Sequence, residues 1–233
     1  MAGAGSPSVS PGVNPSVSVV IPVRNGARFI RDAVDSIFAQ AGFDLEVIVV
    51  DNCSEDGSAD VVTAAFGDCV MVTRESQRGA AHARNAGVRI ATREYLAFLD
   101  ADDVWEPQKL AKQHAALIAS PPIDLLFCRA VEFADDDAHR RLCRPEPYSC
   151  VAPSALFCRR ETFLRAGEIP AVDGGEFIAW YGAATGMGMK MSVLPDVLVR
   201  RRIHSANSTR DPRTIAGYVS AAKWLLDRKR NTS

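Results

Sequence analysis

Short apolar runs alternate along this chain with longer segments whose apolar residues recur at helical spacing. Residues 16–23 form a β-branched run, and residues 29–38 repeat apolar positions three and four apart. Residues 45–50 are almost continuously apolar, which is typical of a strand buried on both faces of a parallel sheet. The alternation continues with helices expected at 57–66 and 80–91 and strands at 69–73 and 94–99. This order predicts an α/β fold with a Rossmann-like, mostly parallel sheet flanked by helices.

The pattern is less regular after residue 105, where we expect a smaller second half. Helices are expected at 106–119 and 176–185, and strands at 125–131 and 191–199. A final helix is opened by Asp211 and Pro212, as N-cap and first residue. Residues 132–152, rich in Asp, Arg and Pro, predict a surface excursion from the sheet. Residues 1–15, rich in Gly, Ala, Ser and Pro, are expected to be a disordered arm.

Composition and charge exclude several classes of protein. The chain has 233 residues, 47% of them hydrophobic, which is enough to bury one sizeable core. Its net charge of −1 argues against a nucleic-acid-coating protein, because that affinity needs an excess of cations. The six cysteines lack metal-ligand spacing, so we expect free thiols. No signal peptide and no apolar run of about 20 residues is visible, so a cytoplasmic protein is expected.

The strongest chemical signal is an apolar strand that ends in three carboxylates. The segment Phe98-Leu-Asp-Ala-Asp-Asp103 places Asp100, Asp102 and Asp103 within four residues. Carboxylates are hard ligands that suit Mg²⁺ or Mn²⁺, and these cations in turn neutralise phosphates. A solvated acidic turn or a helix N-cap is the alternative. The position at the carboxyl end of a central strand favours a ligand site.

A second signal follows the buried strand at 45–50. Asp51 and Asn52 stand at its tip, where a side-chain oxygen can accept from a base N–H or a ribose hydroxyl. Ser54 and Asp56 can serve as caps of the next helix. That alternative does not extend to Asp51, which comes too early in the chain to cap.

A third signal is the glycine-entered helix Arg78-Gly-Ala-Ala-His-Ala-Arg-Asn-Ala-Gly87, which carries Arg84 and Asn85. Helix N-termini and guanidinium groups both suit a diphosphate. The alternative is that Arg84 pairs with a carboxylate on the protein surface.

Five motifs, taken in order, resemble those of family 2 glycosyltransferases of the GT-A fold. They are Val20-Ile-Pro-Val-Arg-Asn25, Val50-Asp-Asn-Cys-Ser-Glu-Asp-Gly-Ser58, Ala83-Arg-Asn-Ala-Gly87, Phe98-Leu-Asp-Ala-Asp-Asp103 and Leu198-Val-Arg-Arg-Arg-Ile-His-Ser-Ala-Asn-Ser208. The resemblance implies an inverting hexosyltransferase that takes a sugar from a nucleotide donor. It also implies a nucleotide-sugar-binding half at 16–105 and an acceptor-side half at 106–210.

The resemblance assigns roles to individual residues. The implied donor-binding residues are Pro22, Val23, Arg24, Asn25, Asp51, Asn52, Arg84, Asn85, Asp100 and Ala101. The implied ligands of Mn²⁺ or Mg²⁺ are Asp102, Asp100 and His204. A UDP-sugar is the expected donor, although many family members carry a second Asp in place of Asn52.

The general base is where this chain departs from the family pattern. Members of the family provide a Glu-Asp pair that opens a helix, and here Glu176 matches the Glu while Phe177 replaces the catalytic Asp. Either Glu176 or Asp173 is therefore expected to act as base. Both also suit simple duties at a helix N-terminus. The alternative function is a catalytically silent GT-A domain that binds a nucleotide or nucleotide sugar as an interaction module.

The acceptor is not identified by any motif, and a lipid-linked glycan, a small molecule or a peptide all suit a cytosolic enzyme. The segment 211–233 is expected to be an amphipathic helix with a basic tail. Its apolar stripe comprises Ile215, Tyr218, Val219, Ala222, Leu225 and Leu226. The stripe predicts either packing on the domain or peripheral contact with an anionic membrane on the cytoplasmic face.

Overall fold

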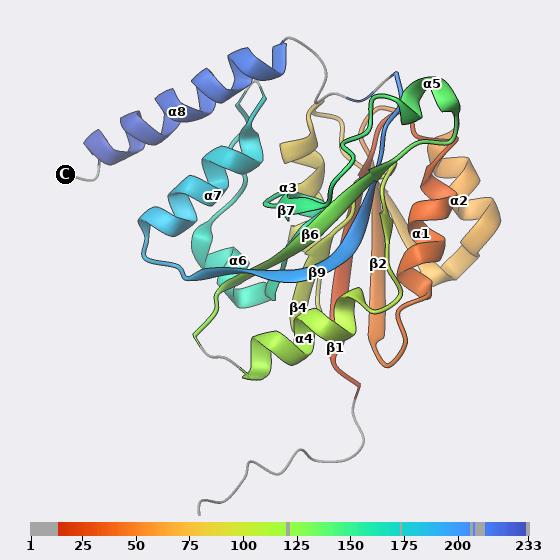
Figure 1. Cartoon of the computed structure of the whole chain (residues 1–233), viewed down its shortest axis with the longest axis horizontal. Helices are drawn as coiled ribbons and strands as arrows, with labels where there is room; N and C mark the ends of the chain where they lie inside the picture. Colours follow the sequence, from red (N-terminus) through yellow and green to blue (C-terminus); the bar gives the residue numbers. More distant parts are fainter. Residues whose placement is uncertain (1–13, 120–121, 173, 206, 208–212, 232–233) are drawn as a thin grey trace, which may run out of the picture.

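The computed structural model describes residues 14–119, 122–172, 174–205, 207 and 213–231. The described residues form a nine-stranded sheet with the order β3-β2-β1-β4-β8-β6-β9-β5, in which β7 also pairs with β6 (Figure 1). The predicted α/β class with a mostly parallel sheet is confirmed. Most of the expected N-terminal arm, together with Asp173, Asp211 and Pro212, lies outside the described residues.

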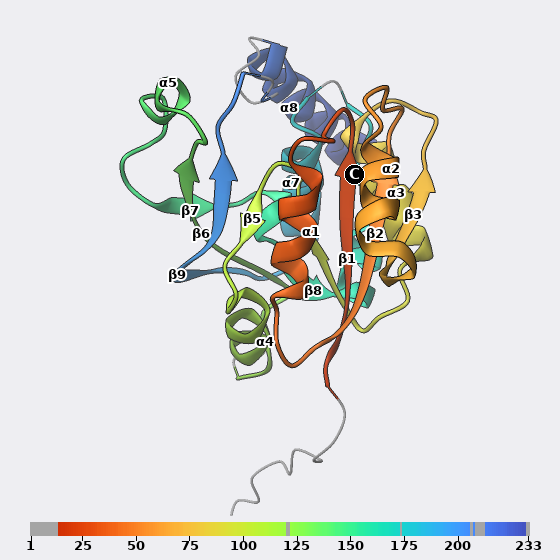
Figure 2. The same cartoon turned by 90° about the vertical axis from the view of Figure 1, so that its right-hand side faces the viewer.

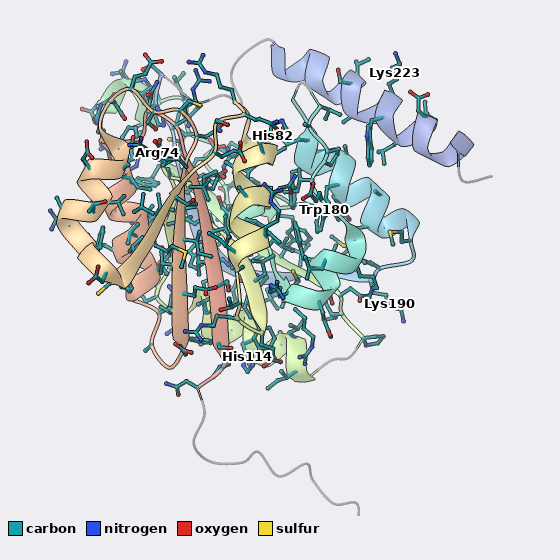
Figure 3. The ribbon with its side chains drawn as sticks, turned by 180° about the vertical axis from the view of Figure 1, so that it is seen from behind. Arg74, His82, His114, Trp180, Lys190 and Lys223 are labelled. Atoms are coloured by element: carbon teal, nitrogen blue, oxygen red, sulfur yellow. The ribbon has the colours of Figure 1, made fainter. Side chains whose placement is uncertain are left out.

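The first half follows the predicted alternation. Strands β1 (Ser16–Val23), β2 (Asp44–Asp51), β3 (Val70–Arg74) and β4 (Tyr95–Phe98) pair in parallel. The helices between them are α1 (Ile30–Phe38), α2 (Ser58–Phe66) and α3 (Ala80–Ile90), and a 3-10 turn lies at Gly67–Cys69. Figure 3 shows α3 lying over β1 and β2, while α1 and α2 face the viewer in Figure 2. The buried valines and isoleucines of β1 and β2 fill the space between these helix layers.

The second half is more irregular, as its pattern predicts. Its strands are β5 (Val104–Trp105), β6 (Leu125–Phe133), β7 (Tyr148–Cys150), β8 (Phe157–Arg159) and β9 (Met191–Arg202). Its helices are α4 (Lys109–Ala119), α5 (Asp137–Arg140), α6 (Arg160–Ala166), α7 (Glu176–Gly186) and α8 (Arg213–Asn231), with a 3-10 turn at Pro153–Ala155.

The segment 132–152 is not simply a surface excursion. Its first two residues complete β6, and its end forms β7, which pairs antiparallel with β6. Cys150 of β7 lies opposite Cys128, and both side chains are buried. A three-residue strand after several prolines has too few positions to show an alternating pattern, so the sequence did not reveal it. The exposed turn around α5 is the part that does leave the sheet (Figure 2).

Strand direction gathers the functional loops at one edge. Strand β8 is antiparallel to both β4 and β6, so β6 runs in the direction of β4, and β9 is parallel to β6. The carboxyl ends of β1, β2, β4 and β9 therefore meet at the same edge of the sheet, where ligands of such sheets bind.

Helix α8 packs against α7, as Figures 1 and 3 both show. Its contacts run through Gly217 and Ala221, which approach Gly175, and through Leu225, which lies against Gly182. The packed face differs from the predicted stripe, because Val219 and Leu226 are 68% and 59% exposed, and Ala222 is also exposed. Small residues set the contact face here, since they let the two helix backbones approach closely. No helix in the described ranges is long and apolar enough to cross a membrane.

Candidate functional site

A cavity of about 420 Å³ opens at the edge where the strands end. Its walls come from the loops after β1, β2 and β4, from the first turns of α3 and α7, and from the end of β9. Of the residues expected to bind donor or metal, those in the wall are Pro22, Val23, Arg24, Asn25, Asn52, Arg84, Asp100, Ala101, Asp102 and His204, and the expected base Glu176 joins them. The fold thus brings most of the sequence-predicted site together.

The loop after β1 is fastened to the loop after β2. Asn25 adopts a left-handed backbone (φ 54°), which Asn tolerates better than most residues, and its Oδ1 accepts from the backbone N of Glu55 at 2.8 Å. In return, Ser54 Oγ accepts from Asn25 N at 3.1 Å, and Asp56 Oδ2 accepts from Ala27 N at 2.9 Å. Ser54 and Asp56 therefore hold the cavity wall in addition to any capping duty.

Asp51 and Asn52 are both used inside the protein. Asp51 is buried, accepts from Ser54 N at 3.1 Å and does not line the cavity. Asn52 does line it, but its Nδ2 donates to the carbonyls of Glu75 and Gln77, and its Oδ1 accepts from Gly79 N at 2.7 Å. The amide thereby holds the 75–79 segment, from which α3 begins. Its oxygen is already bonded and is a weaker candidate for base contact than the sequence implied.

Arg84 joins two carboxylates across the cavity. Its Nη2 donates to Asp100 Oδ1 at 2.6 Å and its Nη1 to Glu176 Oε1 at 3.3 Å, from a side chain that is only 6% exposed. Burial lowers the pKa of Arg84, but the charges of Asp100 and Glu176 outweigh it and raise the pKa overall. The alternative of an ion pair on the protein surface is wrong, because the carboxylates that Arg84 contacts line the cavity. Arg84 fixes the carboxylate after β4 relative to the carboxylate that opens α7.

Asn85, which the resemblance placed at the donor, faces away from the cavity. Its Nδ2 donates to Ile169 O at 2.8 Å and its Oδ1 accepts from Ile169 N at 2.9 Å. Both groups of this buried amide are satisfied by one residue of the α6–α7 connection. The side chain anchors α3 to that connection and is not available to a ligand.

Asp102 and His204 form the pair that suits a divalent cation. Asp102 Oδ2 lies 3.0 Å from His204 Nε2 and accepts from Asn207 Nδ2 at 3.1 Å. Phe29 orients the imidazole, with ring centroids 4.5 Å apart. Within the described residues no group of three or more His, Cys, Asp or Glu side chains is placed to hold a metal. Two protein ligands suit Mg²⁺ or Mn²⁺, which keep waters and substrate phosphates as further ligands.

Asp103 also lines the cavity, but its carboxylate is bonded within the protein. Its oxygens accept from Ser154 Oγ at 2.9 Å and from Arg202 N at 3.2 Å. Burial, followed by the charges of Asp102 and Asp100, raises the pKa of Asp103 well above its usual range. The third carboxylate of the motif therefore fixes the loop after β4 against the end of β9.

The first turn of α7 directs Glu176 toward the cavity and Phe177 into the core. Glu176 faces the cavity, with its side chain 22% exposed, whereas the next residue, Phe177, is buried against Trp180 at 5.3 Å between ring centroids. Gly175, left-handed at φ 67°, provides the turn into the helix. Phe177 thus belongs to the hydrophobic core, and nothing is described of Asp173.

Besides glycines and alanines, the wall contains three residues that sequence reasoning missed, namely Phe29, Arg201 and Asn207. Asn207 lies in the last of the five family motifs, which ends at Ser208, and was identifiable from it. Phe29 reads as an ordinary core position of a helix. Arg201 is the middle of three arginines, and strand alternation alone turns it to the opposite side from Arg200 and Arg202.

Comparison with known proteins places the chain in a family. The sequence pattern of glycosyl transferase family 2 matches residues 18–183. Among curated relatives, the putative teichuronic acid biosynthesis glycosyltransferase TuaG of Bacillus subtilis is 40% identical over 102 residues, which are 42% of this chain and 40% of TuaG. The chain spans less than half the length of the curated relatives that it matches first.

Two solved structures share the fold. The mannosyltransferase PcManGT of Pyrobaculum calidifontis, in complex with GDP-Man and Mn²⁺, superposes with a TM-score of 0.73 at 24% identity, over 94% of this chain and 66% of that one. TarS 1–349 of S. aureus, in complex with UDP-GlcNAc, gives 0.72 at 20% identity, over 91% and 66%. With more than half of its length matched by the family pattern, and with this architecture, the chain belongs to glycosyl transferase family 2 and has the GT-A fold.

Proposed function

We propose that this chain transfers a hexose from a UDP-sugar to an acceptor hydroxyl, with inversion at the sugar carbon and with help from a divalent cation. One observation carries the proposal. The Asp102–His204 pair and the Glu176 carboxylate line the same cavity. A cation site and a base on one cavity are what displacement of a nucleoside diphosphate by a hydroxyl requires.

The donor end is supported by the loops after β1 and β2. Pro22 to Asn25, Asn52 and Gly79 line the part of the cavity that the loops after β1 and β2 form, and this part is assigned to the nucleoside. Asp102 and His204 would hold Mn²⁺ or Mg²⁺ beside the diphosphate. When bound, the cation supplies Lewis-acid stabilisation of the charge that develops on the leaving phosphate. GDP- and dTDP-sugars are the competing donors.

The base is Glu176, with Asp173 in reserve. Arg84 holds Oε1 of Glu176, and Oε2 has no protein donor among the described residues. Oε2 takes the proton of the acceptor hydroxyl as its oxygen bonds to the sugar carbon, and the bond from that carbon to the diphosphate breaks with its electron pair. Attack from the side opposite the leaving group inverts the configuration. Arg84 holds the carboxylate in place through its contact with Oε1.

The experiment measures donor binding and turnover separately. UDP-, GDP- and dTDP-glucose are titrated by calorimetry with Mn²⁺ or with EDTA, and turnover is followed as release of nucleoside diphosphate with water as acceptor. We expect Mn²⁺-dependent affinity that is highest for the UDP-sugar. Asp102→Asn should remove the Mn²⁺ dependence. Equal affinity with Mn²⁺ and EDTA in the unchanged protein would refute the proposed cation.

The base is tested by Glu176→Gln, which keeps size and hydrogen bonding but removes basicity. Turnover should fall by about 10²- to 10⁴-fold while donor affinity stays within about twofold, because a base acts in the transition state. Glu168→Gln, an exposed carboxylate paired with Arg89, is the matched control and should change neither. Unchanged turnover in Glu176→Gln would refute the assignment.

A second candidate function is a GT-A domain that binds the donor without transferring the sugar. It is favoured by one observation, the burial of Phe177 where family members carry the base. Tight Mn²⁺-dependent donor binding with no detectable turnover in the unchanged protein would support it over the transferase.

A further inference from the structure

The middle arginine at the end of β9, Arg201, opens onto the cavity, and among the described residues no carboxylate lies within hydrogen-bond distance of its guanidinium. Arg201 Nη1 donates to Tyr148 Oη at 3.1 Å. The nearest carboxylate in the described ranges, that of Asp103, lies 4.0 Å from Nε, which is beyond hydrogen-bond distance, and both Asp103 oxygens are engaged by Ser154 and Arg202. The Arg201 side chain is 23% exposed and lines the cavity.

The two neighbouring arginines on β9 behave differently. Arg202 is buried and donates to Asp32, to Asp135 and to the carbonyl of Asp102. Arg200 lies on the outer surface, with Glu106 at 4.0 Å. A guanidinium has five N–H donors, and in the described residues Arg201 uses one of them. Its remaining donors form a fork that matches a carboxylate or a phosphate.

The position of Arg201 limits which part of a substrate it can reach. The nucleoside part of the wall comes from the loops after β1 and β2, and the cation pair comes from Asp102 and His204. Arg201 is oriented by Tyr148 of β7, which packs on β6 in the other half of the chain. In the proposed arrangement of the donor, the group that Arg201 faces lies on the sugar side of the diphosphate.

We propose that Arg201, oriented by Tyr148, forms an oxyanion subsite for a carboxylate or phosphate carried by the transferred sugar or by the acceptor. This inference rests on the proposed function, since it names the substrate class of the same cavity. A negatively charged substrate would give the guanidinium the hydrogen-bonded oxyanion that Asp103, at 4.0 Å, does not provide.

The donor arm of the test compares three ligands that differ on the sugar side, each with Mn²⁺: UDP, UDP-glucose and UDP-glucuronic acid. Arg201→Met should weaken the binding of UDP-glucuronic acid by about 10- to 100-fold, as expected for the loss of a hydrogen-bonded charge pair. The affinities for UDP and UDP-glucose should stay within about twofold. Arg200→Met is the control and should change none of them. Equal weakening of all three ligands would place Arg201 at the diphosphate and overturn the proposal.

The acceptor arm offers glucose and glucose 6-phosphate to the complex of the protein with UDP and Mn²⁺. If Arg201→Met selectively loses affinity for glucose 6-phosphate, the subsite belongs to the acceptor. If it selectively loses affinity for UDP-glucuronic acid, the subsite belongs to the transferred sugar. If Arg201→Met keeps the selectivity of the unchanged protein in both arms, the proposal is overturned. If UDP-glucose still binds with Mn²⁺, the proposed function survives that outcome.

Two gentler variants keep the test decisive if Arg201→Met does not fold. Arg201→Lys retains the charge but not the fork, so it should lose part of the selectivity. Tyr148→Phe removes the hydroxyl that orients the guanidinium and should weaken the same anionic ligand by a smaller factor. Folded variants of both kinds with unchanged selectivity would refute the subsite.

Discussion

At the scale of single residues, the site is a set of charges held in place by other charges. Arg84 fixes Asp100 and Glu176, Asn207 and His204 fix Asp102, and the loops bind one another through side-chain oxygens. Electrostatic groups that are fixed before the reaction need little rearrangement as charge develops. The orientation of Glu176 therefore depends on Arg84 as well as on its position in α7.

Arg84→Lys tests that dependence. Lysine keeps the positive charge but cannot donate to Asp100 and Glu176 with the planar fork of arginine, so we expect turnover to fall by about 10-fold or more. Mn²⁺-dependent affinity for UDP should change less, because Asp102 and His204 are untouched. Arg89→Lys, on the exposed side of the same helix, is the control. Kinetics and calorimetry on both variants separate the effects, and equal turnover in the two would contradict the role of Arg84.

Lys109 provides a residue-scale prediction about stability. It is fully buried, its ammonium lies over the Trp105 ring at 4.0 Å, and Nζ donates to Gln113 Oε1 at 2.7 Å. Burial lowers the pKa of Lys109 from its ordinary 10.5 to about 8. Below about pH 8 the folded protein carries a buried ammonium, and the cost, roughly 3 kcal/mol, is fully present. The cost disappears as pH rises through 10.5, where the unfolded chain also loses the proton.

The stability of Lys109→Met relative to the unchanged protein should therefore be highest below about pH 8 and should fall between about pH 8 and 10.5, while the lost bond to Gln113 Oε1 contributes at every pH. Denaturant unfolding of both proteins at several pH values measures the difference, in which the titration of other groups cancels. Lys112→Met, on an exposed position of the same helix, should show no such trend. A relative stability that rises with pH would contradict the sign of the argument.

At the scale of elements, the sequence predicted the first half better than the second, for a physical reason. Strands β1 and β2 are long and buried on both faces, so their apolar runs are unmistakable. Strands β5, β7 and β8 have two or three residues, and they are held by pairing with β9, β6 and β4. Such pairing depends on distant neighbours and leaves no local pattern.

The same limit applies to the candidate site. The carboxylates after β4 could be located because they directly follow a strand, and strand ends converge at one edge. That Arg84 reaches Glu176, 92 residues away, follows only from the packing of α3 and α7. Alternation separates Arg201 from Arg200 and Arg202, but which face of β9 borders the cavity depends on its pairing with β6, whose register shifts twice between Phe127 and Ala130.

Gly87 tests the packing of α3 on β1. A Cβ atom added there would meet Val20 Cγ1 at 2.3 Å, so Gly87→Ala should destabilise the protein by about 1–3 kcal/mol through overpacking. Gly186→Ala is the matched helical control, since an added Cβ there meets nothing within 4 Å. It should be neutral or stabilising by about 0.5–1 kcal/mol. Thermal unfolding compares the pair, and equal stability of the two variants would refute close packing at Gly87.

At the scale of the whole molecule, the two halves of the chain are joined around the cavity by Arg202. Its guanidinium donates to Asp32 on α1 at 2.7 Å and to Asp135 after β6, and its Nε donates to the carbonyl of Asp102 at 3.1 Å. It also lies over the rings of Phe29, before α1, and Phe133, at the end of β6. One buried side chain therefore connects the first helix, the cation loop and the central strand of the second half.

Arg202→Met should consequently affect stability and ligand binding together. Methionine fills part of the space between Phe29 and Phe133 but donates no hydrogen bond, so we expect a loss of about 2–4 kcal/mol in unfolding free energy. The loop that carries Asp102 loses its anchor, so Mn²⁺-dependent nucleotide affinity should also fall at temperatures where the variant is folded. Arg200→Met, two positions earlier on β9 and on the outer surface, should change neither stability nor affinity by much. If Arg202→Met lost stability but bound UDP and Mn²⁺ like the unchanged protein, Arg202 would be a packing residue that does not position the cation loop.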